Sequence, residues 1–167
     1  LGQSLFEEAE RRGVEVIIMT NSLAATDNLM AFNGYLRNRD DLLRAGVEIY
    51  EFRPDAAVRR SIMTSARARE TGEYPVFGLH AKTLVVDGEV LVVATFNLDP
   101  RSANLNTECF VSMRSKDLAE RVLQQIDEEM KPENSWHTTL DWNPNAEGGW
   151  LKRFTLFWHG ILPKSIL

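Results

Sequence analysis

Cysteine and histidine are scarce in this chain of 167 residues, which has one cysteine and three histidines. Cys109 therefore has no partner for a disulfide within the chain, and the three histidines lie too far apart in the sequence for a zinc site. A domain of this size buries about 70% of the surface of its unfolded chain, so its core needs neither a disulfide nor a metal. We expect one domain that binds no metal.

Long apolar runs and an excess of basic charge are also missing. No run reaches the ~18 consecutive apolar residues of a membrane-spanning helix. Nineteen basic against 24 acidic residues give a net charge of -5. Nucleic-acid binders draw their affinity mainly from basic side chains on phosphates, so the net charge argues against a tight nucleic-acid binder. Basic residues outnumber acidic ones only in segments 53–73 and 150–167.

Helical and strand-like patterns alternate along the chain. This alternation predicts the α/β fold class, with a mixed β-sheet flanked by helices. Two signals are clear: Asp87-Gly88 between apolar runs predicts a β-hairpin, and Ser115 is a typical N-cap. The expected helices are 4–13, 28–45, 116–131 and 150–162, the expected strands are 14–20, 47–52, 77–86, 90–96 and 107–113, and 53–76, 97–106 and 132–149 are expected to lack regular structure.

The hairpin carries an unusual group of polar residues. Alternation along the first strand puts His80 and Lys82 on one face. With a two-residue turn, Thr95 and Asn97 of the second strand join that face. Burial of these groups without partners costs about 1–3 kcal/mol for each unsatisfied group. A bound phosphate would satisfy all four, whereas a single histidine or lysine on a strand is more often a solvated surface residue.

These residues belong to a longer pattern, His80-Ala-Lys82-Thr-Leu-Val-Val-Asp87, which is followed by ATFNLDPRSANLNTE. The pattern resembles the HKD motif of the phospholipase D superfamily. Ala94-Thr95 stand where the family has Gly-Ser, and Thr95 keeps the hydroxyl group. The stretches VEVIIMTNSLAATDN and NRDDLLRAGVEIYEFRP further resemble the C-terminal halves of bacterial cardiolipin synthases. The resemblance implies a phospholipase D-like lobe, a mixed sheet between helices, over nearly the whole chain.

The resemblance also implies roles for the site residues. His80 would be the nucleophile that attacks phosphorus, or its acid/base partner, while Lys82 and Asn97 would hold the nonbridging oxygens. Thr95 would contact the substrate. Glu108 would orient the His80 ring, unless it is simply an exposed strand carboxylate. The family's chemistry uses no metal and no other cofactor.

Asp87 is expected to have a different role from the other motif residues. It lies at the predicted turn, on the opposite side of the strand period from His80. We therefore expect it to be structural, as a turn former or a salt-bridge partner, rather than a contact to phosphate.

The family's active site contains two HKD motifs, and this chain has one. His137 and His159 are not followed by a lysine two residues later. Either the chain is the C-terminal half of a two-motif enzyme whose N-terminal half is missing, or a second copy of the chain completes the site. The chain starts at Leu1 rather than at methionine, which favours the first alternative and a lost N-terminal segment.

The leading interpretation is a phosphatidyl transferase that forms cardiolipin or a related phospholipid through a phosphohistidine. The first alternative is a phosphodiesterase that uses water on the same site, with phospholipid or nucleic acid as substrate. The second is a noncatalytic half that serves as a membrane-docking module. In each case residues 1–149 would form the lobe with the single HKD motif.

Residues 150–167 are expected to form a C-terminal amphipathic helix that faces a membrane. Its polar side would carry Lys152, Thr155 and His159. The segment has three basic residues and no acidic one, which suits an anionic membrane surface. Together with the resemblance to bacterial cardiolipin synthases, this implies a peripheral protein on the cytoplasmic face of the bacterial inner membrane; packing of this helix on the domain's own core is the alternative. The apolar side would comprise Trp150, Leu151, Phe154, Phe157, Trp158, Ile161 and Leu162.

Overall fold

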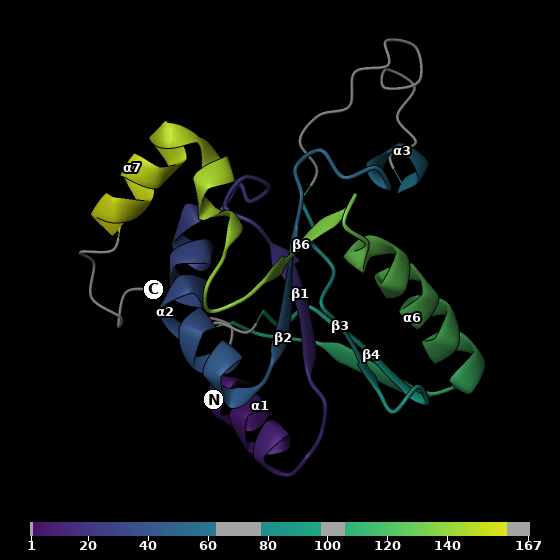
Figure 1. Ribbon diagram of the computed structural model, residues 1–167. Coiled ribbons are helices and arrows are strands. Elements are labelled where there is room, and N and C mark those ends of the chain that lie inside the picture. Colours follow the sequence, from purple (N-terminus) through teal and green to yellow (C-terminus); the bar gives the residue numbers. More distant parts are fainter. Residues whose placement is uncertain (1, 63–77, 98–105, 160–167) are drawn as a thin grey trace.

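The computed structural model describes residues 2–62, 78–97 and 106–159. Their strands form two three-stranded sheets, with the orders β1-β2-β6 and β3-β4-β5 (Figure 1). The helices are α1 (Gly2–Arg11), α2 (Leu29–Ala45), α3 (Arg59–Ile62), α6 (Lys116–Met130), α7 (Gly149–His159) and the 3-10 helix η1 (Pro144–Gly148). The strands are β1 (Ile17–Asn21), β2 (Glu48–Phe52), β3 (Thr83–Val86), β4 (Val90–Ala94), β5 (Phe110–Arg114) and β6 (Ser135–Thr138).

The first sheet is mixed, because β1 and β2 are parallel while β2 and β6 are antiparallel. Helices α1 and α2 cover one side of it, and α6 lies on the other (Figure 1). Its core is apolar: Leu42 of α2 packs on Val47 and Ile49, with Phe6 of α1 and Val16 against them. Gly46 ends α2 with φ 109°, and its N–H bonds to the carbonyls of the last helical turn. The predicted α/β class with a mixed sheet is confirmed.

The second sheet, β3-β4-β5, is antiparallel throughout. Helix α6 contacts β3 and β4 of this sheet as well as β2 and β6 of the first, so it is shared by both. Ala119 of α6 is fully buried, and Ser115 accepts a hydrogen bond from the backbone N–H of Leu118 as the predicted N-cap.

The register of the hairpin differs by one residue from the prediction. Val86 pairs with Val90, so Glu89 belongs to the turn together with Asp87 and Gly88. Both central residues have positive φ, 52° and 64°, and the Glu89 N–H bonds to the Val86 carbonyl. The Glu89 carbonyl accepts from Ser115 N–H at the start of α6, which continues the pairing of β4 with β5.

The observed register also changes which residues of the two hairpin strands lie opposite each other. Thr83 rather than Lys82 lies opposite Val93, and the carbonyl of Lys82 accepts from Ala94. A shift by one residue moves a side chain to the other face of a sheet. The expected two-residue turn is therefore wrong, and with it the pairing that would place Thr95 and Asn97 on the face of His80 and Lys82.

The segment 132–149 is more regular than expected. It contains β6 and η1, although the sequence of β6, SWHT, shows no apolar alternation. β6 forms because its backbone pairs with β2, where Tyr50 lies opposite His137 and their rings stack at 4.9 Å. Within 53–76, the structure describes α3, and residues 63–77 lie outside the described part.

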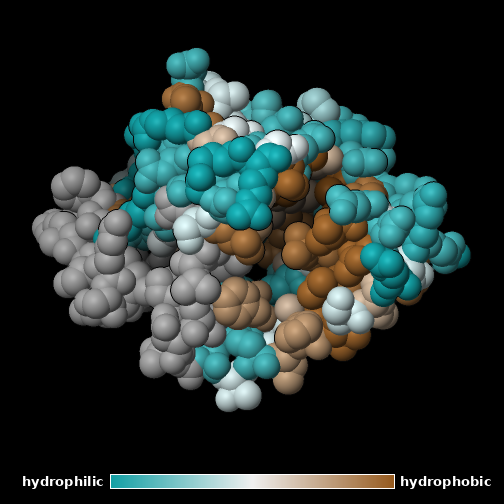
Figure 2. Space-filling model, turned by 90° about the horizontal axis from the view of Figure 1, so that it is seen from below, coloured by the Kyte–Doolittle hydropathy of each residue, from teal (hydrophilic) through white to brown (hydrophobic). Residues whose placement is uncertain are grey.

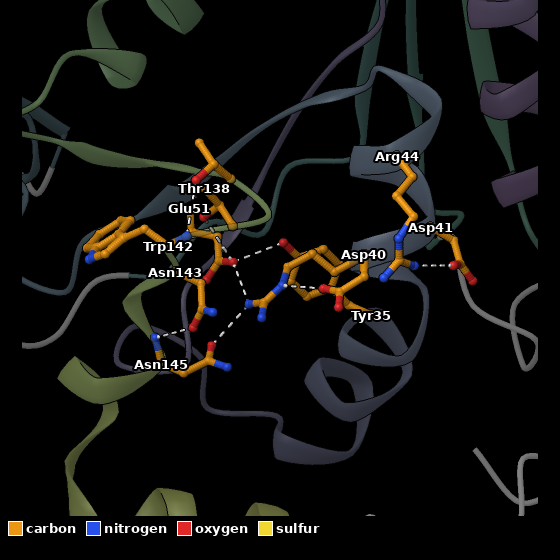
Figure 3. A network of polar contacts seen from close by, with 11 residues as sticks. Tyr35, Asp40, Asp41, Arg44, Glu51, Thr138, Trp142, Asn143 and Asn145 are labelled. Atoms are coloured by element: carbon orange, nitrogen blue, oxygen red, sulfur yellow. Dashed lines mark hydrogen bonds and ion pairs between the residues drawn. The ribbon is translucent and has the colours of Figure 1, made fainter.

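A carboxylate and a guanidinium are buried together between α2 and the first sheet (Figure 3). Glu51 of β2 is fully buried, and its Oε1 accepts from Arg39 at 3.1 Å, Tyr35 at 3.0 Å and Thr138 at 3.2 Å. Arg39 also donates to Asn145 of η1. The network thus connects α2, β2, β6 and η1. Burial raises the pKa of Glu51, and Arg39 acts in the opposite direction.

We predict that Arg39→Met lowers the free energy of unfolding by about 3–5 kcal/mol at neutral pH, because it leaves the Glu51 carboxylate buried without its cation. Loss of the cation raises the pKa of Glu51 further. The folded state then holds the proton more tightly than the unfolded state, so the variant loses stability as pH rises through the raised pKa. Urea unfolding at several pH values measures both effects.

Arg44→Met is the matched control, because Arg44 lies on the same helix in an exposed pair with Asp41. Its cost should stay below about 1 kcal/mol, with little dependence on pH. Equal losses for the two variants would contradict the importance of the buried pair.

Candidate active site

The candidate site residues lie at one end of the sheet β3-β4-β5. In an antiparallel sheet, the start of one strand lies beside the end of the next. His80 and Lys82 lie just before β3, Thr95 and Asn97 lie just after β4, and Glu108 lies just before β5. Asp87 lies at the other end, in the β3–β4 turn where the sequence placed it. The structure therefore separates Asp87 from the other five residues.

His80 and Lys82 are joined by a hydrogen bond. The Nζ atom of Lys82 donates to the backbone carbonyl of His80 at 3.0 Å. His80 is exposed and Lys82 is half-buried. The imidazole is accessible to a substrate, and an ammonium group is fixed to the backbone beside it.

Thr95 and Glu108 form a second pair. The Thr95 hydroxyl donates to Glu108 Oε2 at 2.5 Å and accepts from the N–H of Cys109 at 3.0 Å. Asn106 donates its amide to Glu108 Oε1 at 3.2 Å. The Glu108 carboxylate therefore takes part in a polar cluster with Thr95 and Asn106, and its expected hydrogen bond to the His80 ring stays a prediction.

Sequence reasoning missed two asparagines at this site. Asn106 lies two residues before Glu108 and bonds to it. Asn21, at the end of β1, bonds through its side chain to both backbone groups of Leu79, the residue before His80. The signal for Asn21 was its place directly after the apolar run 14–20 that predicts a strand, in the stretch TNSLAATDN that also carried the family resemblance.

The site offers an imidazole, an ammonium group, hydroxyl and amide groups, and one carboxylate. Three or more His, Cys, Asp and Glu side chains gathered as a metal site are not found among residues 2–62, 78–97 and 106–159. The groups present can attack phosphorus, offset negative charge on phosphoryl oxygens and donate hydrogen bonds to them. The arrangement suits the chemistry of a phosphate ester.

Comparison with known families decides the identity of the fold. The family model "Cardiolipin synthase, PLD-like domain" matches residues 2–130. The chain belongs to this family. The phospholipase D-like domain so matched contains all six residues that the motif singled out, His80, Lys82, Asp87, Thr95, Asn97 and Glu108.

Individual relatives agree with this membership. The phospholipase D-like chain is 37% identical to cardiolipin synthase C of Escherichia coli K12 over 131 residues. These residues make up 78% of this chain and 27% of the synthase. An uncharacterized protein of Helicobacter pylori J99 is 32% identical over 86% of this chain and 28% of its own length. Cardiolipin synthase 2 of Staphylococcus epidermidis is 31% identical over 73% of this chain and 20% of its own length. The chain spans about a quarter of the length of these relatives.

A solved structure supports the fold. A phospholipase D family member from Salmonella typhimurium superposes with a TM-score of 0.54, over 82% of this chain and 72% of that one. The two are 14% identical in sequence, so the likeness concerns the fold alone. The expected phospholipase D-like lobe is confirmed.

Proposed function

We propose that this domain transfers a phosphatidyl group and takes part in forming cardiolipin or a related phospholipid. The observation that carries the proposal is the motif His80-x-Lys82-x4-Asp87 in a domain of the cardiolipin synthase family, with His80 and Lys82 at one end of a sheet. His80 is accessible, and Lys82 and Asn97 lie at the same end of the sheet. The donor is a phospholipid, and the acceptor is the hydroxyl group of phosphatidylglycerol or a related lipid.

The proposed reaction exchanges one phosphodiester for another in two displacements. In the first, a ring nitrogen of neutral imidazole attacks phosphorus, a P–N bond forms, and the P–O bond to the donor's alcohol breaks. The departing alcohol takes a proton from the second histidine of the complete site. In the second, the acceptor hydroxyl gives its proton to that histidine and attacks phosphorus, and the P–N bond breaks. Lys82 and Asn97 stabilise the charge on the nonbridging oxygens during both steps.

Hydrolysis is the second candidate, because water can replace the acceptor hydroxyl in the same mechanism. The structural neighbour is a phospholipase D family member, and it resembles this chain in fold. A phospholipid diester is favoured over nucleic acid as substrate because the net charge of this chain is -5. A noncatalytic docking half is disfavoured because His80, Lys82, Asn97 and Glu108 are all present.

We predict that His80→Ala lowers turnover at least ~100-fold in the complete two-histidine enzyme, because it removes the attacking or proton-transferring group. The exposed His80 side chain makes little contribution to the core, so the melting temperature should stay within about 2 °C of the wild-type value. Lys82→Ala should show a similar loss of turnover. Lipid products and thermal unfolding are measured together.

His137→Ala is the matched control, since His137 is an exposed histidine of β6 that lacks the motif. It should retain turnover close to wild type. A His80→Ala enzyme with more than a tenth of wild-type turnover would sink the assignment of His80.

The proposed site is half of a two-histidine site, completed by an N-terminal HKD half or by a second copy of the chain. The surface supports such a partner, because hydrophobic residues gather around a hollow on the side of the molecule shown in Figure 2. The sheet β3-β4-β5 leaves large hydrophobic side chains exposed next to the site, including Phe110 at 72% and Val111 at 58%. Monomeric soluble proteins rarely expose large contiguous apolar patches.

We predict that the isolated 167-residue chain shows little turnover at low concentration, because it supplies one histidine of the two that the mechanism uses. EDTA should not lower the activity of the complete enzyme. Light scattering gives the mass of the chain in the same samples that are assayed. A strictly monomeric chain with full activity would overturn the half-site proposal, and loss of activity in EDTA would overturn the metal-free mechanism.

Helix α7 supports the proposed contact with an anionic membrane. Its residues Trp150, Leu151 and Phe154 are 78%, 61% and 56% exposed, while Lys152 points inward to backbone carbonyls. The helix thus presents these apolar side chains outward, as expected of an interfacial helix, while it packs on α2 and η1. The side chains of 157–159 and residues 160–167 lie outside the described part. The described helices include none long and apolar enough to cross a membrane. We propose a peripheral protein on the cytoplasmic face of the bacterial inner membrane.

We predict that Phe154→Glu weakens binding to vesicles that contain phosphatidylglycerol at least ~10-fold, since a charged group replaces an apolar one at the interface. Binding should also weaken as salt increases, because nearby cations contribute about 1 kcal/mol each on anionic lipid. Gln124→Glu adds the same charge on the exposed side of α6 and should bind nearly as wild type. Vesicle flotation measures binding; unchanged binding after removal of residues 150–167 would refute the membrane contact.

A further inference from the structure

The residue directly before His80 is held by a side chain from the other sheet. Asn21 ends β1, and its Nδ2 donates to the carbonyl of Leu79 at 2.8 Å. The N–H of Leu79 donates to Asn21 Oδ1 at 2.7 Å. One amide side chain thus satisfies both backbone groups of Leu79, as a neighbouring strand would. The pair joins segments 58 positions apart in the sequence.

Asn21 begins a compact loop, residues 21–26, which we call the bracket loop. Ser22 Oγ accepts from the N–H of Ala25, and the Thr26 N–H bonds to the Ser22 carbonyl at 2.9 Å. The N–H of Ser22 bonds to the carbonyl of Phe52 at the end of β2. Ser22, Ala25 and Thr26 are buried. The bracket loop is therefore closed by its own hydrogen bonds and attached to the first sheet.

The backbone before His80 rests directly on this loop. A Cβ atom built on Gly78 would lie 3.2 Å from the carbonyl oxygen of Ala25 and 3.4 Å from Asn21 Oδ1. These distances lie at or below the lower limit of ordinary van der Waals contact. The absence of a side chain at Gly78 therefore permits its backbone to approach the loop this closely. Two consecutive residues, Gly78 and Leu79, are thus seated on the bracket loop, and His80 follows them.

Helix α7 holds the bracket loop from another direction. Lys152 Nζ donates to the carbonyls of Thr26 at 2.7 Å, Ala24 at 2.8 Å and Leu23 at 3.2 Å. The three hydrogens of the ammonium group thereby match three carbonyl acceptors. Burial lowers the pKa of Lys152. The side chain of Leu23 packs so closely on Gly148 of η1 that a Cβ atom there would lie 2.5 Å from it.

We propose that Asn21 is a positioning residue for His80, and that Lys152 acts through the same bracket loop from α7. The inference rests on the proposed function of His80, which it deepens. Asn21 fixes the backbone of Leu79, and one further residue carries the imidazole. A displacement of a reacting group by about 1 Å can cost ~100-fold in rate, so a bond one residue from the nucleophile has a large effect on turnover.

The contacts also give α7 a role in the site. The helix that presents Trp150 and Leu151 outward has Lys152 on the bracket loop, and the loop holds Leu79. Any shift of α7 that moves Lys152 is therefore transmitted through these carbonyls toward His80. The effect of Lys152 on turnover should be smaller than that of Asn21, because it acts through one more set of contacts.

The test measures kcat, KM and thermal unfolding of Asn21→Ala, Asn21→Asp and Lys152→Met in the complete enzyme. Asn21→Ala should lower kcat at least ~10-fold while KM stays within about 2-fold, because placement of the nucleophile changes rather than substrate binding. Asn21→Asp keeps the acceptor for the Leu79 N–H but sets a carboxylate against the Leu79 carbonyl. It should lower kcat and shift the pH profile, because it brings a charge next to His80.

Matched controls separate positioning from general destabilisation. Asn38→Ala removes an amide that donates within α2 to Gly34, and Lys116→Met removes an exposed lysine of α6. Both should keep wild-type kcat. Unchanged kcat in folded Asn21→Ala overturns the proposal, and so does a loss fully explained by the unfolded fraction. If Asn21→Ala does not fold, Lys152→Met decides: kcat lowered at constant KM supports the proposal, and wild-type kcat overturns it.

A readout on the ring itself distinguishes this proposal from the proposed function. The imidazole resonances of His80, assigned by their absence in His80→Ala, should shift in Asn21→Ala and stay in place in Asn38→Ala. If His80→Ala remains active but these resonances move, the catalytic assignment fails while the positioning stands. If His80→Ala is inactive and the resonances and kcat of Asn21→Ala match wild type, the positioning fails alone.

Discussion

The hydrogen-bonded pair between Asn21 and Leu79 is the contact on which the geometry of the site depends. The fold places its strands in two separate small sheets, and the motif residues lie at one end of the second. The side chain of Asn21, at the end of the first sheet, satisfies both backbone groups of the residue before His80. Helix α6 packs on both sheets and holds them together elsewhere. His80 thus lies beside one sheet, while the residue before it is bonded to the other.

The first sheet contains a buried ion pair. Desolvation of Glu51 and Arg39 is costly, and three hydrogen bonds on one carboxylate oxygen offset it. The network connects α2, β2, β6 and η1, and η1 in turn packs against Leu23 of the bracket loop. The rigidity of the bracket loop therefore has its origin in the core of the first sheet. This arrangement favours a single position for Leu79.

Helix α7 and the sheet β3-β4-β5 both expose large apolar side chains to solvent. Exposed Trp150 and Phe110 are each costly in water, and each lies on an element next to the site or to the bracket loop. Family membership makes a phosphodiester in a lipid the natural substrate class for the proposal. In the proposed function, such a substrate would reach the imidazole from a lipid surface, and a second histidine would come from another half. The apolar side chains of α7 would contact the lipid, and those of the sheet β3-β4-β5 would contact the other half.

The sequence by itself determined the local features. The N-cap at Ser115, the end of α2 before Gly46, the hairpin turn at Asp87 and the family motif all depend on residues close together in the chain. The tertiary structure alone decided the rest. β6 has no strand pattern and exists because β2 pairs with it, and the hairpin pairs Val86 with Val90, so that Glu89 joins the turn. The inward direction of Lys152 and the bond of Asn21 to Leu79 likewise join distant segments. Periodicity records which residues are apolar, but it holds no information about which distant backbone groups will meet.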